Sequence, residues 1–147
     1  MMLAGILAVA AQAVAPAPVE LGDIRMHLFY KETGRLSDDV SPPRNFAAWN
    51  TPIGGGEAEE PATDLLVVAE IRTDGQQNVR MPLRVTARNA RGRVLGDRRL
   101  TEMLTSETGR AYFPLWLRDT GCAGIITVTA TLGGQSKTET LTLHCGE

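Results

Sequence analysis

The sequence has few of the side chains that build metal centres and catalytic groups. Its 147 residues include two cysteines and two histidines, His27 and His144. A zinc site draws three or four ligands, mostly from these residue types. The Gly-x-Ser-x-Gly pattern of a nucleophile elbow is also absent. We therefore expect no metal, no cofactor and no catalysis.

Long apolar runs, helical periodicity and a strong net charge are missing as well. No long stretch repeats apolar residues with the spacing of a helix. The apolar run at residues 3–11 is too short to cross a bilayer as a helix. The net charge is only −2. The sequence therefore predicts no transmembrane span and no nucleic-acid partner.

The N-terminal segment has features of an export signal. Its apolar run is followed by Ala11-Gln12-Ala13, a small-x-small cleavage pattern, although no Lys or Arg precedes the run. We interpret residues 1–13 as a cleavable signal peptide, residues 14–22 as an extended spacer and residues 23–147 as one folded domain. An apolar N-terminal strand or a disordered tail is the alternative. A signal peptide predicts a periplasmic or secreted protein.

The C-terminal stretch predicts a β-hairpin. Two runs of alternating apolar and polar residues flank Gly133-Gly134, a pair that accepts the backbone angles of a tight turn. A turn there pairs residues whose numbers sum to 267, so Cys122 lies opposite Cys145. We expect these two cysteines to form a disulfide, which contributes about 3 kcal/mol. Two free buried thiols are the alternative.

Two charged residues break the pattern of the hairpin. In the predicted register, Lys137 and Glu139 fall on the apolar side near the turn. We interpret this as a turn that projects past the core. A β-bulge is the alternative explanation, and it would also move the cysteine pairing.

Alternating runs elsewhere predict further strands. They lie at residues 24–31, 64–72, 80–89, 93–95 and 110–118, whereas residues 100–108 are ambiguous. In the second run the pattern places Glu70 and Arg72 on the outer face. About seven strands separated by turns predict an all-β fold, an antiparallel two-sheet sandwich that resembles the immunoglobulin fold in architecture. The inter-sheet cysteine pair and intervening tryptophan of immunoglobulin domains are absent.

A long loop in the N-terminal half, residues 32–63, interrupts these strands. Loops of this length are usually functional or disordered, and Phe46 and Trp49 argue against simple disorder. These two aromatic residues are candidates for binding a partner, or for packing the loop across the sandwich. The acidic residues in and after the loop are candidate calcium ligands or acid–base groups, although the spacing of a known calcium loop is missing; they are Glu57, Glu59, Glu60 and Asp64.

Three arginines form the other candidate binding surface. Arg80, Arg84 and Arg88 occupy alternate outward positions of the run at residues 80–89, about 13 Å apart at 3.3 Å per residue. Arginine binds carboxylates and phosphates through paired N–H groups. The alternative is a charged outer face that prevents aggregation.

The sequence favours a non-enzymatic, exported binding or assembly module. Its partner is another protein or an anionic component of the cell envelope. The alternative is an accessory or hydrolytic domain that acts on an envelope glycan through the acidic loop residues. That reading requires two carboxyl groups facing each other across a cleft.

Overall fold

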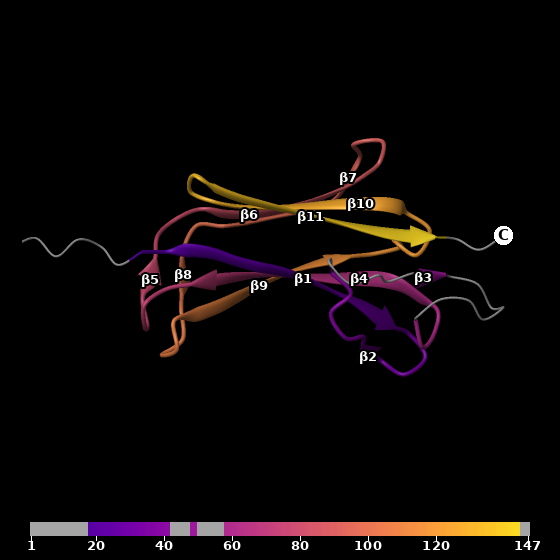
Figure 1. Cartoon of the computed structure of the whole chain (residues 1–147), viewed down its shortest axis with the longest axis horizontal. Helices are drawn as coiled ribbons and strands as arrows, with labels where there is room; N and C mark the ends of the chain where they lie inside the picture. Colours follow the sequence, from indigo (N-terminus) through magenta and orange to yellow (C-terminus); the bar gives the residue numbers. More distant parts are fainter. Residues whose placement is uncertain (1–17, 42–47, 50–57, 145–147) are drawn as a thin grey trace, which may run out of the picture.

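The computed structural model describes residues 18–41, 48–49 and 58–144. Its strands form two layers that face each other (Figure 1). Sheet A has the order β2-β1-β4-β9, in which the neighbouring strands are antiparallel. Its strands are β1 (Glu20–Tyr30), β2 (Arg35–Leu36), β4 (Ala62–Arg72) and β9 (Arg110–Leu117).

Sheet B is the opposite layer and has the order β3-β11-β10-β6-β7. It contains β3 (Ala48–Trp49), β6 (Leu83–Asn89), β7 (Val94–Leu100), β10 (Gly124–Leu132) and β11 (Gln135–His144). All its pairs are antiparallel except the short parallel contact of β3 with β11. A third, two-stranded sheet joins β5 (Asn78–Val79) to β8 (Met103–Leu104).

Seven of these strands are long, and their order is that of an immunoglobulin-like sandwich. Counted along the chain, the first, second and fifth long strands form sheet A, and the seventh, sixth, third and fourth form sheet B. Constant-type immunoglobulin domains share this arrangement, except that their fourth strand lies beside the fifth. The prediction of an all-β antiparallel sandwich is confirmed.

The core lies between the inner faces of the two sheets. Alternate residues of each long strand point inward, since side chains along a strand alternate between faces. Sheet A contributes Met26, Leu65, Val67, Ile71 and Leu117, and sheet B contributes Leu83, Val85, Ile126, Val128 and Leu132, all essentially inaccessible to solvent. The strands predicted at residues 24–31, 64–72 and 110–118 therefore face the core as their alternation indicates.

The predicted hairpin register is confirmed. Every pair from Gly124 with Leu143 to Leu132 with Gln135 sums to 267. Gly133 at the turn has a φ of 56°, in the region that favours glycine. Continuing this register by two residues places Cys122 opposite Cys145, but Cys145 lies outside the described residues, so the disulfide stays a prediction.

The interpretation of Lys137 and Glu139 was wrong. The core reaches the turn, because Ala130 opposite Lys137 and Val128 opposite Glu139 are fully buried. The register of β10 and β11 is also unbroken, which rules out the bulge. Among the described strands, β3 flanks β11 only at Leu143 and His144, so the part of β11 that carries the two charges lies at the edge of sheet B. There Lys137 Nζ reaches Asp23 Oδ1 of β1 at 3.4 Å.

The segments before β1 and between β2 and β4 are described only in part. The predicted signal peptide, residues 1–13, and residues 14–17 of the predicted spacer lie outside the described residues. The end of the predicted spacer, residues 20–22, is already part of β1, so the folded domain begins earlier than residue 23. Within the predicted loop, the chain forms β2 and then continues along β1, where Ser37 N donates to Leu28 O and Val40 N donates to Met26 O. No helix in the described part of the chain is long and apolar enough to cross a membrane.

Candidate functional site

The structure does not place the three candidate arginines on one strand. Arg84 and Arg88 lie in β6, but Arg80 precedes it, in the link from β5. Proline has no backbone N–H and cannot donate to a sheet ladder, so pairing with β10 starts after Pro82, at Leu83. The prediction was wrong for Arg80.

These arginines also have partners within the protein. Two nitrogens of Arg84 bond the carboxylate of Asp97, the Nε at 2.9 Å. Hydrogen bonding to Arg84 lowers the pKa of Asp97 below its usual value and keeps the pair charged. Arg80 pairs with Glu102 at 3.5 Å, and Arg88 donates to the carbonyl of Gly92. Much of their charge is therefore compensated, which weakens this surface as an anion site.

The aromatic candidates of the long loop stay predictions. Phe46 lies outside the described residues. Trp49 is in β3, where its backbone is the register partner of His144.

The acidic candidates do not form a cluster. Glu57 lies outside the described residues. Glu59 forms an ion pair with Arg35 at 2.9 Å, and Glu60 accepts a hydrogen bond from the hydroxyl of Thr33. Among the residues that the structure describes, no group of three or more His, Cys, Asp or Glu residues is arranged to hold a metal ion.

Asp64 is occupied at the start of β4. Its carboxylate accepts bonds from the Thr63 hydroxyl, the Asp119 backbone and the Trp116 indole. Burial alone would raise the pKa of Asp64, but these bonds outweigh it, so the pKa lies below its ordinary value. The group is an ionised acceptor that holds Trp116 in place, rather than a proton donor.

The outer face of sheet A brings together aromatic side chains that the sequence analysis did not select. Tyr112 and Trp116, alternate outward residues of β9, are 51% and 41% exposed. The Phe29 ring of β1 meets the Trp116 ring edge-on, with centroids 5.2 Å apart. Leu66 and Val68 of β4 lie half-buried between the two flanking strands. We call this surface the aromatic face.

One arginine of the aromatic face stacks on a ring. Arg25 points outward from β1, and its guanidinium lies 4.9 Å from the centroid of the Tyr112 ring. This cation–π contact holds the guanidinium over the ring, and the Arg25 residue as a whole is half-buried. Arg25 takes part in none of the ion pairs between described residues, in contrast to Arg72 and Arg110 beside it.

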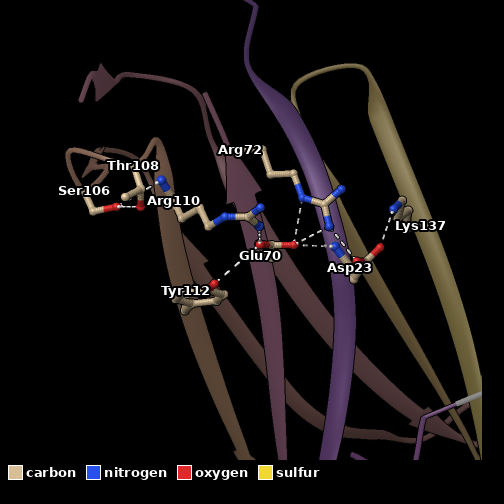
Figure 2. A network of polar contacts seen from close by, with 8 residues as sticks. All are labelled: Asp23, Glu70, Arg72, Ser106, Thr108, Arg110, Tyr112 and Lys137. Atoms are coloured by element: carbon tan, nitrogen blue, oxygen red, sulfur yellow. Dashed lines mark hydrogen bonds and ion pairs between the residues drawn. The ribbon is translucent and has the colours of Figure 1, made fainter. Parts of the chain in front are cut away.

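A buried carboxylate organises one end of this face. Glu70 is only 4% exposed, although its position in β4 points outward. Figure 2 shows its carboxylate between the guanidinium groups of Arg72 and Arg110, with the Tyr112 hydroxyl nearby. Arg72 Nε donates to it at 2.9 Å, and Arg110 bonds its other oxygen. Glu70 lies on the outer face as expected, but the neighbouring side chains shield its carboxylate from solvent.

The charge state of Glu70 follows from these contacts. Burial alone would raise its pKa, but hydrogen bonds from Arg72, the Asp23 backbone and Arg110 lower it more. Glu70 is therefore ionised, and it ties β4 to both neighbouring strands.

A β-bulge makes room for this carboxylate. The register between β1 and β4 shifts between Leu21 and Ile24, so two residues of β1, Gly22 and Asp23, lie opposite Glu70. A Cβ at Gly22 would come within 2.6 Å of Glu70 Oε2. Asp23 then bonds Arg72 of its own sheet and Lys137 of the other sheet, which Figure 2 shows as a chain of contacts.

Solved structures include proteins with a weak overall likeness to this chain. No family model matches the sequence, and no curated protein matches it. A β-glucuronidase of Bifidobacterium dentium, solved in complex with coumarin-3-O-glucuronide, matches over 87% of this chain and 18% of its own, with 14% identity and a TM-score of 0.42. The C-terminal domain of wzt matches over 88% of this chain and 74% of its own, with 10% identity and a TM-score of 0.42. The likeness is one of β-sandwich architecture.

Proposed function

We propose that this protein is a non-enzymatic binding module of the periplasm or extracellular space, and that the aromatic face contacts its partner macromolecule. One observation carries the proposal: Tyr112 and Trp116 are large, partly exposed rings on the same face of one strand. Aromatic side chains dominate the energetics of binding surfaces because they bury much area with little loss of rotamer freedom.

The surroundings of these rings support a binding role. Trp116 is held by the Asp64 carboxylate and by Phe29, and Tyr112 carries the Arg25 guanidinium. Side chains that are fixed before a ligand arrives lose less entropy when it binds. The central strands of sheet A provide the rigid support, since β4 is paired on both sides over most of its length.

The export part of the proposal depends on the sequence. Residues 1–13 match a signal peptide, and a disulfide between Cys122 and Cys145 suits an oxidising compartment. The hairpin register supports that pairing.

In the described part of the chain, no observation favours the hydrolytic alternative. Glycoside hydrolysis needs two carboxyl groups that flank one bond. Glu59 is paired with Arg35, and Asp64 with three donors.

Retention on isolated envelope material tests the proposal. The full-length gene is expressed with export, and the processed protein is purified and sedimented with insoluble envelope material. We expect the native protein to co-sediment and the double variant Tyr112→Ala/Trp116→Ala to lose most of this retention. Ile125→Ala is the matched control, because Ile125 is a 46% exposed apolar side chain in β10 of the other sheet.

The outcomes decide the proposal. Equal retention of the native protein and the double variant assigns binding to another surface, and absence of retention for the native protein contradicts the binding role. Circular dichroism of each variant shows whether it is folded. Failure of the processed protein to appear outside the cytoplasm contradicts the export part.

A further inference from the structure

The aromatic face specifies a ligand class, and this inference rests on the proposed function. We propose that its ligand is an acidic oligosaccharide chain, in which one uronic acid carboxylate pairs with Arg25 and another sugar ring of the same chain lies on Trp116. The ligand chemistry follows from the charge, the rings and the spacing of this face.

The charge of the face points to an anionic ligand. Arg72 and Arg110 are compensated by Glu70 and Asp23. Arg25 instead has the Tyr112 ring below it, and its planar donors match the two oxygens of a carboxylate. Because the ring already fixes the guanidinium, a carboxylate can bind there without first ordering a flexible side chain.

The second contact is a flat ring. Trp116 is fixed by two contacts, its Nε1 to Asp64 Oδ2 at 3.3 Å and its edge-on packing with Phe29. The face of an aromatic ring carries negative potential and attracts the weakly positive C–H groups of a sugar ring. The sugar hydroxyls then remain at the edge, in contact with water.

The spacing of the two contacts requires a chain. Tyr112 and Trp116 are four residues apart in β9, about 13 Å at 3.3 Å per residue. Pro114 lies between them on the same face and places no hydrogen-bond donor there. One sugar ring cannot reach both Trp116 and the Arg25–Tyr112 pair, whereas consecutive units of an oligosaccharide can.

A linear chain fits this face better than a globular protein does. A standard protein interface buries about 800 Å² on each partner around an apolar centre. At the centre of the aromatic face, Leu66 and Val68 are already half-buried by their neighbours, so the exposed rings stand apart. The two separate rings of Tyr112 and Trp116, with Arg25 stacked on Tyr112, match a chain of sugar units that carries repeated carboxylates.

Isothermal titration with defined oligosaccharides tests the proposal. The probes are a uronic acid hexasaccharide, the same hexasaccharide with its carboxyl groups reduced to alcohols, and the free uronic acid. We expect the acidic hexasaccharide to bind, the reduced one to bind at least tenfold more weakly, and the monosaccharide to show no measurable binding. The tenfold figure is the lower end of what one charged hydrogen-bonded pair contributes.

Four variants locate the contact. Arg25→Ala and Trp116→Ala should each weaken binding of the acidic hexasaccharide tenfold or more. Arg25→Lys keeps the charge and loses the planar donors, so it should bind with intermediate affinity. Arg99→Ala is the matched control, since Arg99 is an exposed arginine of β7 that has no part in the aromatic face, and it should bind like the native protein.

The outcomes separate this proposal from the general one. Equal affinity for the acidic and reduced chains, or an Arg25→Ala variant that binds normally, overturns the carboxylate assignment. If no oligosaccharide binds while envelope retention still depends on Tyr112 and Trp116, the ligand is another macromolecule, such as an acidic protein. If retention and oligosaccharide binding are both absent, the proposed function fails as well.

Discussion

Replacing Glu70 by glutamine should destabilise the fold more than any loss of an exposed ion pair. Glu70→Gln keeps the size of the side chain and removes the charge that Arg72 and Arg110 share. A hydrogen bond to a charged group contributes about 1.5–3 kcal/mol. Because both arginines are partly exposed and can be hydrated again, we expect a total loss of about 2 kcal/mol, less than the sum for two fully buried bonds.

Thermal unfolding followed by circular dichroism measures this loss. For a domain of this size, 2 kcal/mol corresponds to a decrease in Tm of about 5–10 °C. Glu102→Gln is the control, because Glu102 also pairs with an arginine, Arg80, but at an exposed position. The control should lose less than about 0.5 kcal/mol.

The pH dependence of the same difference is a sharper test. The pKa of Glu70 in the folded protein lies below its unfolded value, which is near 4.5. Its contribution is therefore fully present above about pH 4.5 and is lost as the pH falls through the folded pKa. The gap in unfolding free energy between the native protein and Glu70→Gln should be constant from pH 6 to 8 and shrink in acid. A gap that is the same at pH 7 and pH 3, or no larger than that of Glu102→Gln, would refute the reasoning.

Two further predictions concern the chain connections. Gly109→Ala should lower the free energy of unfolding by more than about 3 kcal/mol, because Gly109 has a φ of 72° and a Cβ there would lie 2.0 Å from the carbonyl oxygen of Thr73. Gly75→Ala, at a φ of 69° with open space around it, should lower it by only about 1–2 kcal/mol. Urea unfolding measures both losses, and equal losses would contradict the steric clash at Gly109. Cys122→Ser should lower the free energy of unfolding by about 3 kcal/mol. Thiol labelling of the denatured but unreduced protein should leave Cys122 and Cys145 unmodified, while labelling of either would contradict the predicted disulfide.

The features that were predictable from the sequence are local. The hairpin at Gly133 is defined by its own turn and by period-two alternation, so its register follows from about twenty consecutive residues. The inward residues of β4 and β9 follow from the same alternation. Local signals of this kind also account for the fold class, because seven alternating runs with no helical pattern leave few other architectures.

The features that were missed depend on distant residues. Alternation correctly places Glu70 on the outer face, but its burial requires Arg72 and Arg110, from its own strand and from β9, and a bulge in β1 at Gly22. The alternation of residues within one strand does not indicate which strands lie beside it in the sheet. Pro82 is the exception, because it is a local signal: a residue without an N–H cannot donate to the ladder, the pairing with β10 starts at Leu83, and Arg80 falls outside β6.

The aromatic face was visible in part. The alternation of residues 110–118 already put Tyr112 and Trp116 on the side opposite the core. What the sequence did not show is that β1 lies two strands away and supplies Arg25 and Phe29 to the same surface. Trp49 and the regular spacing of Arg80, Arg84 and Arg88 were easier to recognise, because each is apparent within one short stretch of the sequence.

The edges of the sandwich give a reason to expect binding on a face. An exposed edge strand can pair with a strand of another protein, and inward-pointing charges on an edge prevent this. At one side, β11 carries Lys137 and Glu139 on its inner face, and Lys137 reaches Asp23 across the gap between the sheets.

At the other side of the sandwich, β7 is protected in a similar way. Arg98 crosses from β7 to sheet A, where it donates to the carbonyl of Pro114 and stacks over the Phe113 ring at 4.5 Å. Charged side chains thus lie at both sides of the sandwich, beside edges where an added strand would pair. A partner that uses backbone pairing meets these charges, whereas a partner that uses side-chain contacts finds the rings of Tyr112 and Trp116 on the open face of sheet A. Substitutions at Lys137 or Arg98 should therefore leave oligosaccharide binding unchanged, while Trp116→Ala weakens it tenfold or more. The opposite result in the oligosaccharide titration would move the site to the edge.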